Sequence, residues 1–281
     1  MTITVLVENT PGGRLAGEHG LSLHVVHGDL VLLHDVGASG LFADNAAALG
    51  IDLALVDLAV LSHGHYDHGG GLGRFFGVND HAPVHMAPAA VEPHYAGLPL
   101  ARREVGIKAD ALERHRDRFR FVEADAEPRP GVHLLTAIGK AHPWVKFNRS
   151  LGALRGGRVA PDDLAHEIAL VMELPEGIAV FTGCGHRGVL NMVDAARARF
   201  PGRAIRAVIG GFHLGGIPGK SLLAESDASV RRVGEGLLER GVGMTWTGHC
   251  TGDRAGRVLN DVMGDRVAFL RTGLVMELPG G

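Results

Sequence analysis

A dense group of metal-ligand side chains, placed directly after an apolar segment, constrains this chain more than any other feature. The apolar run 58–62 has the length of a buried strand, and His63, His65, Asp67 and His68 follow it at once. Imidazole nitrogens and carboxylate oxygens bind divalent metals, and glycines around these residues permit tight turns. A loop that leaves a strand can direct the first two histidines at one ion and the remaining pair at a neighbouring one. The pattern therefore predicts a metal site, and a histidine-rich surface turn that binds nothing is the disfavoured alternative.

Further ligands are expected from later strand ends, because the motif alone does not complete a site for two ions. Three strand-like runs lead into glycine and histidine: 178–182 to His186, 204–210 to His213, and 243–247 to His249. If these strands share one sheet edge, their histidines lie together and meet the first motif. A single histidine of this kind is more often structural, but the repetition favours His186 and His249 as ligands. For His213, a catalytic or substrate-binding role fits equally well.

The distribution of apolar runs predicts an α/β fold with sheets inside and helices outside. Helical periodicity is expected at 187–200 and in a helix capped by Ser226. We expect a single domain, 1–281, although the length also admits two fused half-domains. A polar, Arg-rich segment, 101–129, is expected as an inserted surface helix, with a lid or dimer contact as the alternative. Strands are expected at 3–7, 21–26, 30–34, 58–62, 132–138, 168–173, 178–182, 204–210, 243–247 and 267–271.

Composition excludes several classes of protein. Apolar residues make up 46% of the chain and charged residues 21%, which argues against disorder. The formal net charge of -3 disfavours nucleic-acid partners. No run reaches the roughly 18 apolar residues of a membrane span. No secretory leader is visible, and two cysteines are too few for a disulfide framework, so we expect a cytoplasmic protein with no membrane partner.

The motif His-x-His-x-Asp-His after an apolar strand resembles the signature of the metallo-β-lactamase superfamily. That resemblance implies an αββα sandwich of two mixed β-sheets with helices on the outer faces. The similarity extends to one branch, the 7,8-dihydropterin-6-methyl-4-(β-D-ribofuranosyl)aminobenzene-5′-phosphate synthase-like proteins. The segments that carry it are 18–22 (EHGLS), 34–37 (HDVG), 49–71, 183–186 (GCGH), 210–214 (GGFHL) and 249–252 (HCTG).

Carried onto this sequence, the resemblance implies two metal ions. It assigns one ion to His63, His65 and His186 and the other to Asp67, His68 and His249, with Asp35 holding the ligand loop. Zinc is expected, and iron or manganese suit the same ligands.

One departure from the superfamily pattern affects the bridging ligand. Many of its hydrolases have an aspartate after a Thr-Gly pair, whereas this chain has Cys184. Cys184 and Cys250 are therefore candidate ligands, although a buried neutral thiol is the commoner state. His19 and Lys220 are candidate substrate-binding residues, together with His213.

The main functional prediction is a metal-dependent hydrolase in which a metal-bound hydroxide attacks a small ester, lactone or phosphoester, with Asp67 or a neighbouring histidine moving the proton. The branch implies an alternative, a transferase that joins a dihydropterin diphosphate to a ribosyl-aminobenzene phosphate. A third reading is a non-catalytic metal- or pterin-binding protein, motivated by the missing aspartate. The expected partner is a small anionic or pterin-like molecule, and the Arg-rich segment could support a homodimer.

Overall fold

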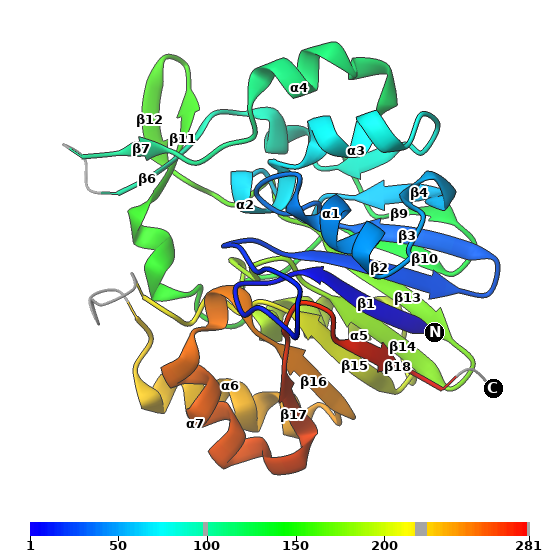
Figure 1. Ribbon diagram of the computed structural model, residues 1–281. Helices are drawn as coiled ribbons and strands as arrows, with labels where there is room; N and C mark the ends of the chain where they lie inside the picture. The colour runs from blue at the N-terminus through cyan, green and yellow to red at the C-terminus, as the bar shows by residue number, and fades with distance from the viewer. Residues whose placement is uncertain (98–100, 217–223, 280–281) are drawn as a thin grey trace. The chain divides into compact units, whose positions relative to one another are not determined.

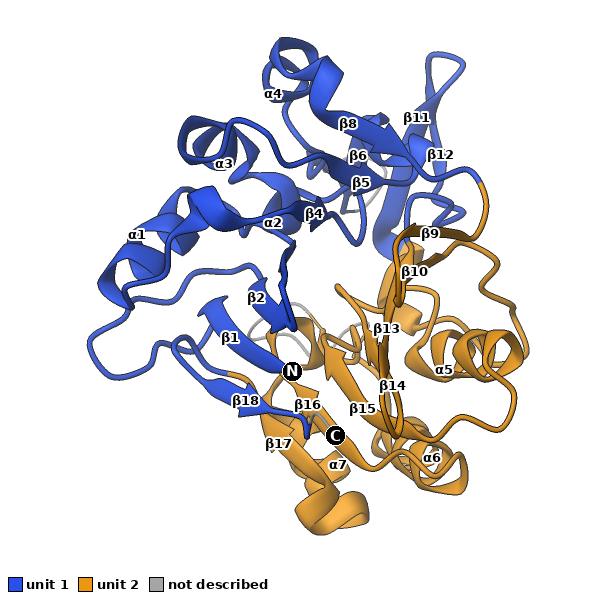
Figure 2. Cartoon of the chain, turned by 90° about the vertical axis from the view of Figure 1, so that its right-hand side faces the viewer, with its two compact units in different colours: residues 1–123, 150–167, 271–279 blue, residues 124–149, 168–270, 280–281 orange. Residues whose placement is uncertain are grey.

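The computed structural model describes residues 1–97, 101–216 and 224–279, and the chain divides into two compact units. Unit 1 comprises 1–123, 150–167 and 271–279, and unit 2 comprises 124–149 and 168–270 with the last two residues (Figure 2). Each unit has its own seven-stranded sheet. The single domain expected over 1–281 remains a prediction. Within the described residues, no helix combines the length and the apolarity needed to cross a bilayer.

The large sheet of unit 1 is mixed and joins both ends of the chain (Figure 1). Its order is β18 (Val275–Glu277), β1 (Thr2–Val7), β2 (Ser22–His27), β3 (Leu30–His34), β4 (Leu58–Val60), β5 (Val84–Met86) and β8 (Phe119–Phe121). The first four strands pair antiparallel, and β3, β4, β5 and β8 pair parallel. Parallel pairing sends the chain from β3 and β4 out of the same sheet edge, where the metal-ligand motif begins.

Four helices and a small sheet complete unit 1. The helices are α1 (Leu41–Ala48), α2 (Tyr66–Gly69), α3 (Leu72–Val78) and α4 (Ala109–Arg114). Phe42 of α1 and Phe75 of α3 are fully buried in one apolar cluster with Val84 of β5, so these two helices cover the sheet. The small sheet has the order β12 (Arg158–Pro161), β11 (Leu151–Arg155), β6 (His94–Ala96) and β7 (Arg103–Glu104).

Unit 2 has a sheet of the same mixed kind, with an antiparallel half and a parallel half. Its order is β17 (Val267–Phe269), β16 (Met244–Thr247), β15 (Ile205–Gly210), β14 (Gly177–Phe181), β13 (Ala169–Leu174), β10 (Val132–Leu135) and β9 (Ala126–Arg129). Strands β14 to β17 pair parallel, and the others pair antiparallel. The helices are α5 (Val189–Arg199), α6 (Asp227–Glu239) and α7 (Asp253–Met263).

The helix expected after Ser226 shows how the sequence specifies its own boundaries. The Ser226 side chain accepts a hydrogen bond from the Ser229 N–H, which satisfies one of the unpaired donors at the start of α6. Val230 and Leu237 of this helix are buried with Val208 of β15 in the apolar cluster of unit 2. The expected cap and apolar face of this helix are confirmed.

Each of the ten expected strands is present, most within one or two residues of the expected bounds, and β3 agrees at both ends. The helix at 187–200 is α5. The Arg-rich segment contains β7, α4, β8 and β9, so it is not a single helix, and Ala111 and Leu112 of α4 are partly buried against the apolar cluster of unit 1. Helices α1 to α3 and α7 and strands β5 to β9, β11, β12 and β18 were not expected. The short turns are η1 (Leu53–Leu55), η2 (Pro88–Val91), η3 (Arg116–Arg118), η4 (Lys146–Ser150), η5 (His249–Thr251) and η6 (Gly264–Arg266).

Candidate metal centre

The motif of unit 1 leaves the end of β4 and runs into α2. His63 and His65 lie between β4 and α2, and Asp67 and His68 lie in the short helix α2 itself. All four side chains are buried. The rings of His63 and His65 are 4.6 Å apart between centroids, and those of His63 and His68 are 4.2 Å apart. The sequence motif therefore gathers its imidazoles at one place within unit 1.

Asp35 joins two of these histidines through a buried hydrogen-bond network. It follows β3 with a φ of 60°, a left-handed conformation uncommon for a residue other than glycine. Its carboxylate accepts hydrogen bonds from the Ser62 N–H (2.8 Å), the Ser62 hydroxyl (2.8 Å) and His68 Nδ1 (2.6 Å). Burial raises the pKa of the Asp35 carboxyl, but the neighbouring His68 and His34 rings and these hydrogen bonds outweigh it and hold the pKa below its usual value.

This network assigns the protons of two imidazoles. An ionised carboxylate only accepts, so His68 Nδ1 carries a proton, and Nε2 is the nitrogen that the neutral ring can offer to a metal. The single Ser62 hydroxyl proton is donated to Asp35, so this oxygen accepts from His63 Nδ1 at 2.8 Å. His63 therefore also presents an unprotonated Nε2. Neutral rings held through the other nitrogen are the state in which histidine binds metals.

His65 is kept neutral by its surroundings. Burial, followed by the neighbouring His166 ring, lowers the pKa of His65 well below its usual value, and the attraction of Asp67 opposes this only in part. Burial of an imidazole without a matching negative charge disfavours its protonated form. His65 is thus available to a cation over a wider pH range than an exposed histidine.

His19 and Asp67 lie together at the open side of the motif. His19 Nε2 is 3.3 Å from Asp67 Oδ2, and the His19 side chain is 56% exposed against 10% for Asp67. His68 Nε2 is 3.9 Å from the same oxygen. The structure therefore places the expected substrate-binding histidine beside a motif carboxylate that can exchange protons with it.

The later histidines of unit 2 follow neighbouring parallel strands. Strands β14, β15 and β16 pair in that order, so their carboxyl ends share one sheet edge, as expected. The loops are tied together by backbone and hydroxyl contacts: Thr182 Oγ1 donates to the Gly211 carbonyl at 2.9 Å, and the Phe212 N–H donates to Thr251 Oγ1 at 3.0 Å. The rings of His186 and His213 are 4.1 Å apart between centroids.

An amide orients His186. Its Nδ1 is 3.1 Å from Asn148 Oδ1, and the Asn148 Nδ2 donates to the His186 carbonyl at 2.6 Å. An amide oxygen accepts only, so the His186 proton lies on Nδ1 and Nε2 is unprotonated. His213 and His249 have φ values of 51° and 50°, so both loops hold a histidine in the left-handed region.

The two cysteines lie beside His213. Ligand atoms of Cys184, His213 and Cys250 all lie within 4.8 Å of one another. The Cys250 thiol is 3.4 Å from the Cys184 carbonyl and accepts from the His213 N–H at 3.3 Å. Burial raises the pKa of the Cys250 thiol, but the hydrogen bond with Cys184 and the nearby His249 and His213 outweigh it and lower the pKa well below its usual value.

The expected residues thus form two sets, one in each unit, and their joining in a single centre stays a prediction. Lys220 lies outside the described residues. Sequence analysis missed four buried residues around the expected ligands: His94, Asn148, Asp162 and His166. The one local signal was the spacing of Asp162 and His166, four residues apart after β12.

Comparison with known proteins agrees with this geometry. The model of the metallo-beta-lactamase superfamily matches residues 17–187, more than half of the chain. A 7,8-dihydropterin-6-methyl-4-(beta-D-ribofuranosyl)-aminobenzene-5'-phosphate synthase of Methanocaldococcus jannaschii is 27% identical over 241 residues, which cover 83% of this chain and 79% of that protein. The resemblance inferred from the sequence is therefore confirmed.

Solved structures support the same assignment. Tm1679, described as a metal-dependent hydrolase of the beta-lactamase superfamily, is 29% identical, with a TM-score of 0.82 over 99% of both chains. The metallo-beta-lactamase fold protein YhfI of Bacillus subtilis has a TM-score of 0.60 and 14% identity over 98% of both chains, which shows the fold alone. The predicted fold class is confirmed, and the chain belongs to the metallo-beta-lactamase superfamily.

Proposed function

We propose that this protein is a metal-dependent hydrolase of a small ester, lactone or phosphoester. The observation that carries the proposal is the Asp35 network, in which one buried carboxylate and Ser62 fix the protons of His63 and His68 on Nδ1. Both rings then offer Nε2 as a ligand atom. An apolar residue would pack in the interior better than a buried imidazole does. A buried group of oriented imidazoles therefore indicates a binding role.

The donor set fits divalent ions. His63, His65 and His186 would hold one ion, and Asp67, His68 and His249 the other, as the superfamily pattern implies. Asn148 supports the inclusion of His186 in this set, because its amide oxygen holds the His186 proton on Nδ1. Imidazole and carboxylate ligands suit zinc first, and iron or manganese as alternatives. Cys184 and Cys250 are further candidate ligands, and their thiols would favour the softer of these metals.

The chemistry divides between the ions and the chain. When bound, divalent ions supply Lewis acidity and make water acidic enough to act as a nucleophile near neutral pH. Asp67 would accept the proton, and His19, at 3.3 Å and half exposed, would pass it to solvent. His213, beside His186, would contact the substrate or donate a proton to its leaving group.

The proposed substrate is a small anionic or pterin-like molecule, and a homodimer stays a proposal. The hydrolase assignment is supported by the description of Tm1679 as a metal-dependent hydrolase. A second candidate is the transferase that joins a dihydropterin diphosphate to a ribosyl-aminobenzene phosphate, supported by the Methanocaldococcus relative. In that reaction, the same ions would stabilise a diphosphate leaving group.

Side-by-side assays separate these candidates. The purified protein would first be analysed for bound metal, and then assayed with bis-p-nitrophenyl phosphate, a lactone panel and the pterin condensation pair. Turnover in the first two assays, lost in a His63→Ala variant, is expected. Activity on the pterin pair alone would replace the hydrolase with the transferase. A protein that retains metal and binds a pterin without turning over any substrate would be a binding protein, and absence of transition metal after growth in supplemented medium would remove all metal-dependent candidates.

A further inference from the structure

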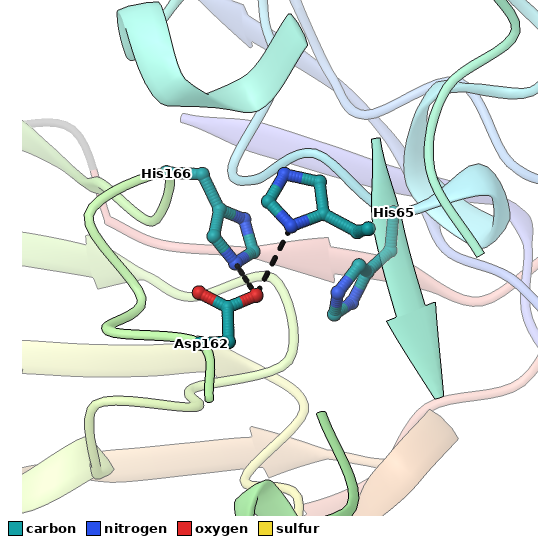
Figure 3. Close-up of side chains that lie close together, drawn as sticks. His65, Asp162 and His166 are labelled. Atoms are coloured by element: carbon teal, nitrogen blue, oxygen red, sulfur yellow. Dashed lines mark hydrogen bonds and ion pairs between the residues drawn. The ribbon is translucent and has the colours of Figure 1, made fainter. Parts of the chain in front are cut away.

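Three buried residues of unit 1 form a cluster beside the motif that the proposed function does not use. His94 lies at the start of β6, and Asp162 and His166 lie on the loop after β12. His94 and His166 are fully buried, and Asp162 is 7% exposed. Figure 3 shows Asp162 and His166 beside His65, with their interactions as dashed lines. Ligand atoms of all four residues lie within 4.8 Å of one another, and the ring centroids of His65 and His166 are 5.1 Å apart.

The hydrogen bonds of the cluster assign its protons. The Gly64 N–H donates to His166 Nδ1 at 3.0 Å, so Nδ1 carries the lone pair. An imidazole that accepts at Nδ1 carries its one proton on Nε2. That nitrogen faces Asp162 Oδ2 at 3.2 Å.

His94 completes the arrangement from the other side of the carboxylate. Its Nε2 is 3.1 Å from the Ala89 carbonyl, which can only accept, and its Nδ1 is 3.0 Å from Asp162 Oδ2. Both nitrogens of His94 therefore face oxygen acceptors. The other Asp162 oxygen accepts from the Leu164 N–H at 2.8 Å. The named polar contacts form one chain, from Gly64 through His166, Asp162 and His94 to the backbone of Ala89.

Gly64 stands between the two histidines that begin the motif, and the cluster holds it from two sides. Besides the hydrogen bond to His166, the space around its α-carbon is closed: a β-carbon there would lie 2.6 Å from the Ala90 carbonyl oxygen and 2.9 Å from His94 Nε2. The backbone at this position has little room to move. Because His63 and His65 lie one residue to either side, the position of Gly64 constrains the backbone from which both rings extend.

The same four ligand atoms could hold a metal ion, but the hydrogen bonds argue against it. Binding through His166 Nε2 would require the proton to leave that nitrogen while Nδ1 still accepts from Gly64, which gives an imidazolate. Binding through His94 Nδ1 would break its bond to Asp162. A metal would have to displace both donors to one carboxylate oxygen.

We propose that His94, Asp162 and His166 form a positioning network that fixes Gly64 and thereby sets the spacing of the ligands His63 and His65. The inference rests on the proposed function, since spacing matters only if these histidines bind a metal. None of the three residues is a metal ligand in this proposal. Residues that orient ligands through one intervening contact typically change metal affinity by about 10- to 100-fold when removed.

The direct test measures amide hydrogen exchange at Gly64 in metal-free protein. Replacing His166 by alanine removes the acceptor of the Gly64 N–H, so its exchange is expected to accelerate by about 10-fold or more. His166→Asn places an amide oxygen near the position of Nδ1 and is expected to restore most of the protection. Asp162→Asn, which keeps the side-chain size, is expected to give an intermediate acceleration and serves if the alanine variant does not fold.

Metal affinity by chelator competition is the second measurement. It is expected to fall by about 10- to 100-fold in His166→Ala and to recover in His166→Asn. The matched control is His133→Gln in unit 2, because His133 is also buried and bonded to a carboxylate, Glu173, at 2.9 Å. It is expected to leave both readouts unchanged.

Two results would overturn the network. One is unchanged exchange at Gly64 in His166→Ala and Asp162→Asn. The other is an extra equivalent of metal in the wild-type protein that Asp162→Asn removes, which would make the cluster a metal site. If the wild-type protein binds no metal at all, the proposed function fails, while the exchange measurement in metal-free protein still decides whether His166 holds Gly64.

Discussion

The two units orient their candidate ligand histidines by different means. In unit 1, an ionised carboxylate does so: Asp35 accepts from His68 directly and from the Ser62 hydroxyl, which in turn accepts from His63. In unit 2, a neutral amide accepts from His186, and thiols surround His213. Hydrogen bonds to a charged acceptor are roughly twice as strong as those between neutral groups. The comparison indicates that unit 1 fixes its ligands firmly, whereas unit 2 leaves its ligands easier to displace.

The two units also differ in the backbone conformation of their candidate ligands. Unit 2 holds His213 and His249 at positive φ, whereas in the motif of unit 1 none of the four ligand-type residues does so. Each such residue costs roughly 1 kcal/mol or more, and persists only where the surroundings enforce it. In unit 1 the described non-glycine residues at positive φ are Asp35 and Leu164, and neither is a candidate ligand. Asp35 supports the ligands through its hydrogen bonds.

The strongest test of this difference replaces Asp35 by asparagine. The amide nitrogen would face the donors of Ser62 and His68 where an oxygen now accepts, so both His63 and His68 lose their fixed protons. We expect metal affinity to fall by about 100-fold, measured by competition with a chromophoric chelator. Asp57→Asn is the control, because Asp57 also accepts from a backbone N–H in unit 1, that of Val31 at 2.8 Å. Equal metal affinity in Asp35→Asn and wild-type protein would contradict the role of the network.

The thiols of unit 2 provide the second test. Cys250 is partly exposed with a lowered pKa, whereas Cys184 is 2% exposed. In metal-free protein at pH 7, we expect iodoacetamide to modify Cys250 more than about 10-fold faster than Cys184, because the thiolate is the reactive form. Peptide mapping by mass spectrometry gives the two rates, and Cys250→Ser identifies its peptide. Faster modification of Cys184 would reverse the assignment.

A third test concerns the neutral anchor of His186. Asn148→Ala removes a pair of neutral hydrogen bonds, so the loss of metal affinity is expected to be about 10-fold or less, and smaller than that of Asp35→Asn. The same chelator competition measures it. The comparison between the units would be wrong if the Asn148 variant lost more affinity than the Asp35 variant.

The sequence could predict the parts of this site that are local. The motif from His63 to His68 is contiguous, and its preceding strand β4 was apparent from its apolar residues. The strand ends at His186, His213 and His249 were found because each follows an apolar run with glycine. Parallel pairing of the three strands is enough to place these ends at one edge of the sheet.

The supporting residues could not be predicted in the same way. His166 is 102 positions from Gly64, and Asp162 is 68 from His94, so no local pattern connects them. Helix α2 has four residues and ends in glycine, which propensity disfavours, and α1 begins without a side-chain cap. These elements depend on burial against the sheet, which a sequence pattern does not display.

The smallest effect is expected from a charged pair of unit 2 that contains none of the candidate ligands. Its removal tests whether charge also stabilises the fold of this unit. Asp194 of α5 accepts from Arg240 at 2.7 and 2.9 Å and lies 3.0 Å from His142 Nε2, and the hydrogen bonds from Arg240 are the main cause of its lowered pKa. A carboxyl with a pKa lower in the folded than in the unfolded state stabilises the fold fully above the unfolded value of about 3.9. That contribution is lost as the pH falls through the folded value. Because Asp194 is about one-third exposed, we expect it to be about 1 kcal/mol or less.

Urea unfolding of metal-free wild-type and Asp194→Asn protein between pH 6 and pH 2.5 measures this contribution. The free-energy difference between the two proteins should be largest at pH 6 and should shrink below about pH 3.9. Asp163→Asn in unit 1 is the parallel variant, because Asp163 also pairs with an arginine, Arg155, but its side chain is 50% exposed. Its smaller expected difference follows from greater solvent screening. A difference for Asp194 that stays constant over the whole range would mean that its ion pair adds nothing to folding, and that the strong use of charge is confined to the buried ligand supports of unit 1.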